Sequence, residues 1–288
     1  MTSGVTVWGI GVIVIKLTVS PFMIVSVYRH AFSIPILAIA WMFHSDRSLP
    51  WRAASFGGVL FALHQIAHLS SLRYSTAAVV TILFSLQPIL VGAFGGRITG
   101  DKATKAFFGW SAVAIGGCVV LIVASSGQAE ATPLGTLLAT LNLVAWSSYY
   151  LATKRARAAT GTISWLLVMT IVSGLIVTAI ALIANEPFFD ADGQEWIKLV
   201  AIALGPATLG HFLVTWAQPR IHVAASSSLN LLVPIVASLG AALFLDEAFG
   251  PLHTLGAAIA LGGTAVAMRR LPPPVVEEAS ERFGEVAT

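Results

Sequence analysis

Long apolar runs recur along the whole chain and are separated by short polar segments. A helix needs about 20 apolar residues to cross a hydrocarbon layer about 30 Å thick, and the pattern predicts ten such helices. Their expected ranges are 4–20, 22–43, 53–71, 76–96, 106–124, 133–152, 162–184, 196–217, 223–244 and 251–268. The runs are too long for the strands of a membrane barrel, which alternate over about ten residues. We therefore expect an all-α, polytopic membrane protein.

Composition favours a lipid environment over a water-soluble core. The 288 residues are 57% hydrophobic and 10% charged, whereas a soluble domain carries about 25% charged residues. The net charge of +3 does not indicate nucleic acid as a partner, because the basic residues form no stripe and no interleaved aromatic platform. The single cysteine, Cys118, leaves no intramolecular disulfide and no cysteine-based metal site.

The basic residues predict an orientation, because Lys and Arg are enriched in cytoplasmic loops. With the N-terminus inside, twelve fall inside: Arg47, Arg52, Arg97, Lys102, Lys105, Lys154, Arg155, Arg157, Arg220, Arg269, Arg270 and Arg282. Arg73, Lys198 and Lys16 fall outside, and Arg29 lies within the second helix. We expect both termini in the cytoplasm and the protein in the cell inner membrane.

The two halves of the chain match each other at fixed offsets. Trp8 and Lys16 correspond to Trp146 and Lys154 at an offset of 138. At an offset of 146, the matches are Pro88 with Pro234, Asp101 with Glu247, and Gly116-Gly117 with Gly262-Gly263. Each half has an odd number of helices, so the second half inserts upside down relative to the first, which is typical of transporters. We expect one five-helix repeat over 1–126, an inverted one over 132–270, and a disordered cytoplasmic tail over 271–288.

At these positions the sequence resembles the drug/metabolite transporter superfamily, specifically its ten-helix EamA type. The segments that carry the resemblance are Val7-Trp8-Gly9, Tyr28-Arg29-His30, Ser75-Thr76-Ala77-Ala78, Gln87-Pro88, Gly100-Asp101, Ala224-Ala225-Ser226, Val233-Pro234-Ile235, Leu245-Asp246-Glu247 and Gly262-Gly263. The family commonly has Gly-Glu where this chain has Gly100-Asp101 and Asp246-Glu247. The resemblance implies a central cavity between the halves and alternating access that exports small organic metabolites such as amino acids.

Polar groups inside hydrocarbon are costly, so each one needs a reason. Arg29 lies about 10 Å into the bilayer, where it either binds an anionic solute group such as a carboxylate or snorkels towards the interface. Lys16 lies nearer an interface, which favours snorkelling. We interpret Lys154 as an ordinary basic residue of the cytoplasmic side.

His64 and His68 are four residues apart and share one helix face. They line the cavity, form structural hydrogen bonds, or bind a metal for which no third ligand is evident, and we expect no metal and no cofactor. His211 shares a face with Thr208 and Thr215 and is also a cavity candidate. The other histidines, His30 among them, lie near predicted helix ends and receive no role.

Further polar side chains share one face of the sixth and ninth helices, where they face a wet cavity or hydrogen-bond another helix. Pro88 and Pro234 predict hinges or kinks at corresponding places, because proline removes a backbone donor. The expected substrate pathway consists of Trp8, Arg29, His64, His68, Gln87, Asn142, Trp146, Tyr150, His211 and Asn230.

Every carboxylate lies in a loop, near a helix end or in the tail, so the usual proton carrier of coupled transport is not evident. The leading hypothesis is a secondary transporter that exports small metabolites and is a monomer or a weak homo-oligomer. The alternative within the superfamily is a multidrug efflux carrier for amphiphilic compounds, which would require an acidic cavity residue. A receptor or scaffold would require a folded soluble module, and an enzyme would require a catalytic constellation at membrane depth.

Overall fold

The computed structural model describes residues 1–45, 47–126, 132–188, 191–245 and 249–275, and within these ranges it is helical, with no strand. The helical segments of the first half are α1 (Thr2–Lys16), α2 (Phe22–Met42), α3 (Trp51–Tyr74), α4 (Ala77–Phe84), α5 (Gln87–Ile98) and α6 (Lys105–Ser126). Those of the second half are α7 (Pro133–Ala156), α8 (Thr162–Ile183), α9 (Gly193–Ile202), η1 (Ala203–Gly210), α10 (His211–Ala217), η2 (Gln218–Arg220), α11 (Val223–Ser228), η3 (Leu229–Leu231), α12 (Leu232–Phe244) and α13 (Pro251–Arg269). Grouped into continuous spans, these segments confirm the predicted all-α fold of ten helices.

Within the described ranges, seven spans are long and apolar enough to cross a membrane by length and composition alone. The other three are α1, α3 and α7. Helix α1 is apolar but has only 15 residues. Helices α3 and α7 have 24 residues each and are less apolar, because they carry His64, His68, Asn142 and other polar side chains of the molecule's centre. They pack against each other, which keeps those groups away from lipid.

Loops that alternate along the chain meet at opposite ends of the bundle. At one end, Arg73 in the last turn of α3 pairs with Glu186 after α8 at 3.2 Å. At the other end, Thr104 before α6 donates to the carbonyl oxygen of Arg270 at 2.9 Å. The helices therefore run antiparallel in sequence, as short connections require, and the Arg73 end is the one that the basic residues assign to the outside.

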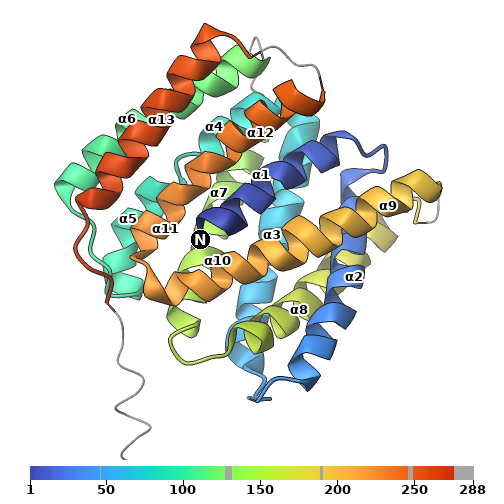
Figure 1. The fold of residues 1–288 in the computed structure, drawn as a ribbon. Coiled ribbons are helices and arrows are strands. Elements are labelled where there is room, and N and C mark those ends of the chain that lie inside the picture. The colour runs from blue at the N-terminus through green and yellow to red at the C-terminus, as the bar shows by residue number, and fades with distance from the viewer. Residues whose placement is uncertain (46, 127–131, 189–190, 246–248, 276–288) are drawn as a thin grey trace, which may run out of the picture.

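The packing partners of the two halves are exchanged in a two-fold manner (Figure 1). Helix α3 packs against α7 and α8, and its counterpart, the span from α9 to α10, packs against α1 and α2. The pairs α6 with α13 and α2 with α8 are each their own counterpart. This exchange is what two inverted five-helix repeats produce. The proposed linker at 127–131, Asp246-Glu247 and residues 276–288 of the expected tail lie outside the described residues.

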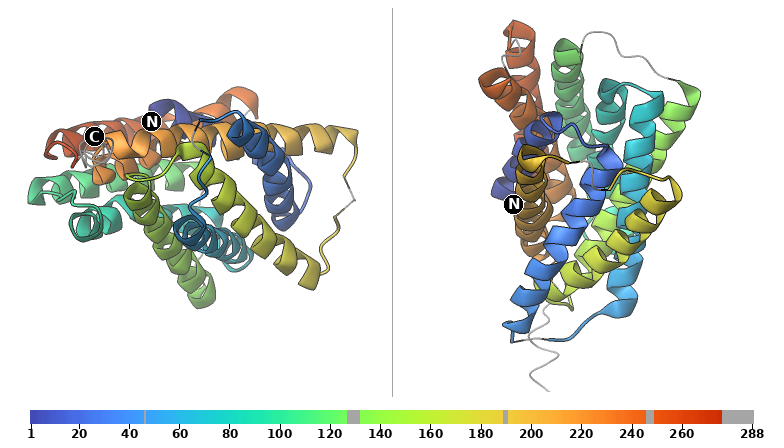
Figure 2. Two further views of the ribbon diagram at one scale, coloured as in Figure 1. Left: turned by 90° about the horizontal axis from the view of Figure 1, so that it is seen from below. Right: turned by 90° about the vertical axis from the view of Figure 1, so that its right-hand side faces the viewer.

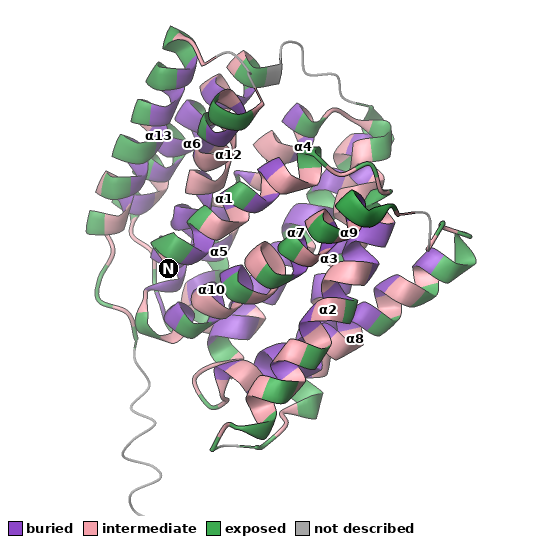
Figure 3. Ribbon diagram, turned by 45° about the vertical axis from the view of Figure 1, so that its right-hand side comes forward, coloured by how far each residue is buried: buried purple, intermediate pink, exposed green. Residues whose placement is uncertain are grey.

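Large apolar side chains cover much of the outer surface of the helices. Exposed examples are Leu175, Leu182, Ile197, Leu243 and Phe244, and exposed positions alternate with buried ones along the helices (Figure 3). An apolar surface of this extent is unfavourable in water and suits contact with lipid tails.

Three spans are irregular near their centres. The fourth span breaks between α4 and α5, with Pro88 in the first turn of α5. The ninth span passes through the 3₁₀ turn η3 directly before α12, and Pro234 is the third residue of α12. The eighth span contains a π-helical segment, η1, with Pro206 inside it. The sequence pattern predicted a regular helix there, because apolar periodicity does not register a change from i→i+4 to i→i+5 bonding.

Helices α6 and α13 lie side by side along one edge of the molecule (Figures 1 and 2). Glycines allow their backbones to approach closely. A Cβ atom on Gly117 would lie 2.4 Å from the backbone nitrogen of Ala260, and one on Gly256 would lie 2.6 Å from that of Leu121. At the neighbouring Gly116, nothing lies within 4 Å of such an atom.

We expect Gly117→Leu to separate α6 from α13, because the new side chain collides with backbone that cannot move independently. Overpacking of this kind costs about 1–3 kcal/mol, which lowers the melting temperature by about 2–12 °C in a protein of this size. Thermal unfolding in detergent measures the change, and Gly116→Leu is the matched control. Equal melting temperatures for the two variants would contradict the packing described.

Candidate substrate site

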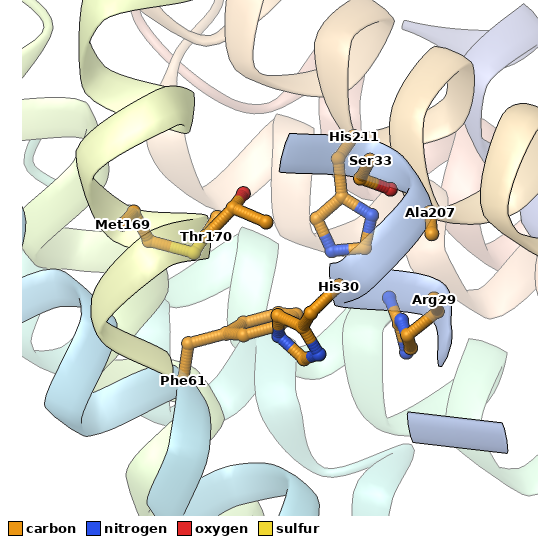
Figure 4. Close-up of a pocket in the computed structure, with 8 residues that line it drawn as sticks. All are labelled: Arg29, His30, Ser33, Phe61, Met169, Thr170, Ala207 and His211. Atoms are coloured by element: carbon orange, nitrogen blue, oxygen red, sulfur yellow. The ribbon is translucent and has the colours of Figure 1, made fainter. Parts of the chain in front are cut away.

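A small cavity near the centre of the bundle is bounded by α2, α3, α8, η1 and α10 (Figure 4). Its empty volume is about 200 Å³. The residues that line it are Arg29, His30, Ser33, Phe61, Met169, Thr170, Ala207 and His211. The cavity therefore contains helices of both halves, as expected for a site between inverted repeats.

Arg29 is the charged residue of this cavity. Its guanidinium carbon lies 5.6 Å from the centre of the Phe61 ring, within the range of a cation–π contact. The three ion pairs found among the described residues are Arg73–Glu186, Asp101–Lys154 and Glu195–Lys198, all near helix ends. The described part of the chain thus offers Arg29 an aromatic face and no carboxylate within ion-pair distance.

His30 lies beside Arg29 in the cavity, which corrects its placement near a helix end. It is buried in α2, its Nδ1 lies 2.6 Å from the Ser26 carbonyl oxygen, and its Nε2 lies 2.9 Å from Ser173 Oγ. The prediction was wrong because His30 was assigned to a helix end, although it directly follows Arg29. Its position in Tyr28-Arg29-His30 was the signal that would have identified it.

His211, Trp8 and the π-helical segment form a compact polar group. Trp8 Nε1 donates to the Pro206 carbonyl oxygen at 3.0 Å and lies 3.2 Å from His211 Nδ1. His211 Nδ1 in turn lies 3.1 Å from the same carbonyl oxygen. The other ring nitrogen, His211 Nε2, is buried and has no hydrogen-bond partner in the described part of the chain, so it is available to a polar atom of a solute.

Asn142 of α7 joins the two histidines of α3. Its Oδ1 lies 2.6 Å from His64 Nδ1, and its Nδ2 lies 3.3 Å from His68 Nδ1. The pair is therefore hydrogen-bonded across helices, one of the alternatives open from the sequence. No group of three potential metal ligands occurs among the described residues, so the geometry gives no support to the metal alternative.

Aromatic rings connect these groups into one cluster. Trp146 lies 4.6 Å from the ring of His64 and 5.7 Å from that of Trp8, measured between ring centres. Phe61 lies 5.2 Å from His211 and 6.2 Å from Trp146. Phe61 was not among the predicted residues, because a lone Phe in an apolar helix gives no signal in the sequence.

A second cavity lies at the two helix breaks, with an empty volume of about 350 Å³. Its lining includes Gln87, Pro88, Asn230 and Pro234, and Asn230 Nδ2 donates to Gln87 Oε1 at 2.8 Å. Tyr150 closes the group by a hydrogen bond between its hydroxyl and Ser226 and lies 6.0 Å from Trp146. The structure thus places the ten predicted pathway residues in two neighbouring polar groups, and their role in transport stays a prediction.

The sequence predicted Lys154 to be an ordinary basic residue of the cytoplasmic side. It lies in the last turn of α7, but it is buried, and its Nζ lies 3.4 Å from Asp101 Oδ2. The sequence did not indicate this burial, because a position one turn from a helix end gives no information about which loops cover it.

Comparisons with known proteins agree with this architecture. The EamA-like transporter family matches residues 133–269. The aromatic amino acid exporter YddG of Ancylobacter novellus is 26% identical over 223 residues, which cover 76% of each chain. A probable terminal-alkyne amino-acid exporter of Streptantibioticus cattleyicolor is 27% identical over 67% of this chain and 65% of that protein.

These comparisons support an EamA-type transporter of the drug/metabolite transporter superfamily. A solved crystal structure that is 22% identical covers 93% of this chain and 96% of its own, with a TM-score of 0.82, and so shows the same fold. The family match and the printed names of the relatives indicate a multi-pass membrane transporter that exports small molecules rather than an enzyme. Its site residues come from both repeats, since Arg29 and Phe61 precede residue 126 and His211 follows residue 132.

The Gln87–Asn230 hydrogen bond couples the two helix breaks. We expect Gln87→Leu and Asn230→Leu each to destabilise the protein and the double variant to lose less than their sum. Hydrogen bonds between membrane helices couple by about 0.6 kcal/mol on average and at most about 1.7. Unfolding by sodium dodecyl sulfate in mixed micelles measures this double-mutant cycle, and strictly additive losses would contradict the bond.

Proposed function

We propose that this transporter exports amino acids by alternating access, with the solute bound between the two repeats at Arg29. The observation that carries the proposal is a guanidinium at membrane depth that contacts a cavity and has no acidic partner within ion-pair distance among the described residues. A buried charge without a partner is unfavourable in hydrocarbon. A solute carboxylate supplies the missing partner.

Arginine suits this task better than lysine would. Its planar guanidinium binds a carboxylate through two parallel hydrogen bonds, which fixes the orientation of the solute as well as its charge. The cation–π contact with Phe61 holds the guanidinium in place without neutralising its charge. The carboxylate of an amino acid is therefore the group we assign to Arg29.

The rest of the amino acid meets aromatic and weakly polar groups. Phe61, Trp8 and Trp146 offer ring faces and edges around His211. Such rings attract both an ammonium group and an apolar side chain, and His211 Nε2 offers one further hydrogen bond. This combination favours amino acids with aromatic or other apolar side chains, and the printed names of both relatives above refer to amino-acid export.

The moving parts are proposed from the helix breaks. Pro88 and Pro234 occupy corresponding breaks beside the second cavity, and we assign hinge motion to them because proline leaves a backbone carbonyl without its helical donor. We place the protein in the cell inner membrane with both termini in the cytoplasm, on the distribution of basic residues. The repeats are proposed at 1–126 and 132–270.

Multidrug efflux of cationic amphiphiles is a weaker proposal. A cationic solute would meet Arg29 as a like charge, and no carboxylate of the described residues lines either cavity. Electrostatics at the centre therefore favours an anionic or zwitterionic solute.

We expect Arg29→Gln to weaken the transport of amino acids by about 10- to 100-fold in apparent affinity, since a hydrogen bond to a charged group contributes about 1.5–3 kcal/mol. Arg29→Lys keeps the charge but loses the paired hydrogen bonds, so it restores only part of the affinity. Counterflow in liposomes containing purified protein, across a panel of amino acids, measures these changes.

Two controls make this experiment selective for the carboxylate. Arg52→Gln alters an exposed arginine at the start of α3 and leaves transport unchanged. Phenethylamine, which is phenylalanine without its carboxylate, is a poor solute for the unmodified protein, and Arg29→Gln removes the preference. Equal transport of the amine and the amino acid by the unmodified protein would end the proposal.

A further inference from the structure

The helices around the centre divide into two bundles by their packing. Bundle one contains α3, α4, α5, α7 and α8, and bundle two contains α1, α2, α9, η1, α10 and the continuous span from α11 to α12. The main contacts between the bundles are those of α2 with α8 and of α5 with α11, and smaller ones join α8 to α10, α2 to α3, and α7 to α11 and η2. Alternating access requires such bundles to separate at one end of the molecule at a time.

Asp101 and Lys154 form a buried ion pair at the end where α5 meets α11. Asp101 follows α5, and Lys154 lies in the last turn of α7, so both belong to bundle one. Their side chains are 0% and 4% exposed, and Lys154 Nζ lies 3.4 Å from Asp101 Oδ2. Neither residue has a part in the proposed substrate site.

The remaining hydrogen bonds of this ion pair reach bundle two. Lys154 Nζ donates to the carbonyl oxygens of Gln218, Pro219 and Ile221, at 3.0, 3.2 and 2.8 Å. Asp101 Oδ2 accepts from the backbone nitrogen of Val223 at 2.7 Å. All four partners lie in the turn that connects α10 to α11, so one ion pair holds the whole turn of the opposite bundle.

The charges match the backbone that they hold. The turn presents carbonyl oxygens at the end of one helical segment to the ammonium group, and the first backbone N–H of the next segment to the carboxylate, which are the favoured polarities. Asp101 Oδ1 also accepts from the nitrogen of Val275 after α13, at 2.8 Å. His222 in the same turn adds no charge, because burial lowers its pKa more strongly than the nearby Asp101 raises it.

This arrangement can release without leaving an unpaired charge. If bundle two moves away, Lys154 and Asp101 still neutralise each other within bundle one, and the entering water replaces their hydrogen bonds to the turn. A buried charge pair that had to split would oppose opening far more strongly, because it would leave each ion alone in a low-dielectric region.

We propose that Asp101 and Lys154 are the residues that clamp this end of the transport pathway shut, and that they must release the 218–223 turn in every cycle. The basic residues assign this end to the cytoplasm. The inference rests on alternating access and does not depend on which solute is carried.

Side-specific labelling tests the clamp without any solute. In a Cys118→Ser background, Ser226→Cys places a thiol on α11 one turn above the clamp, where Ser226 is buried against Tyr150. A membrane-impermeant maleimide is added from the cytoplasmic side of inverted membrane vesicles. We expect Lys154→Met and Asp101→Asn each to raise the labelling rate about tenfold or more. Unchanged rates in both variants, with the protein folded, would overturn the proposal.

Matched variants separate the clamp from charge as such. Arg155→Gln and Lys102→Gln alter exposed neighbours of the two clamp residues and leave the labelling rate at the background value. The exchange Asp101→Lys with Lys154→Asp keeps an ion pair but presents each charge to the wrong backbone groups, so labelling stays fast. Restoration of slow labelling by this exchange would contradict the match with the turn.

A cross-link provides a second test. A Cβ atom on Gly95 of α5 would lie 2.8 Å from Val223 Cγ1, which brings the two Cβ positions to within about 4.3 Å, a disulfide distance. We expect oxidised Gly95→Cys/Val223→Cys protein to lose over about nine-tenths of its counterflow activity and a reductant to restore it. If fully cross-linked protein showed the same counterflow rate as the protein treated with reductant, this end would not need to open.

Failure of amino-acid transport in the unmodified protein would instead refute the proposed function and leave the labelling result intact.

Discussion

Hydrocarbon offers no hydrogen-bond partner, and this constraint governs the whole molecule. Every backbone N–H and C=O at membrane depth must be satisfied inside the protein, which leaves helices as the building material. The same rule applies to polar side chains. They lie on α2, α3, α7 and the breaks of the fourth, eighth and ninth spans, where helices of both repeats face each other. Apolar side chains such as Leu243 and Phe244 lie exposed on the outside.

Within that rule, two kinds of buried polar group can be distinguished. Lys154 is satisfied completely, by Asp101 and three carbonyl oxygens, and such a group acts on the protein's own conformation. Arg29 and His211 Nε2 are satisfied incompletely among the described residues, and such groups act on a solute. The difference assigns recognition to the centre of the molecule and closure to one of its ends.

The sequence predicted the spans well because their length is set by the thickness of the bilayer, and it predicted the two breaks because Pro88 and Pro234 mark them locally. It did not predict the burial of Lys154 or the central position of Phe61, because both depend on which loop or helix lies opposite. Apolar periodicity also left the π-helical segment around Pro206 undetected, although that segment supplies the carbonyl oxygen that Trp8 binds.

The central claim is that the two repeats cross the membrane in opposite directions. Single cysteines in the loops after α1, α3, α5, α7, α8 and α10, labelled in intact cells and in inverted vesicles by an impermeant thiol reagent, test it most directly. The account predicts that the loops after α1, α3 and α8 react from outside and those after α5, α7 and α10 from inside. If α1 and α7 instead crossed the membrane in the same direction, the inverted repeat and the site built on it would be wrong.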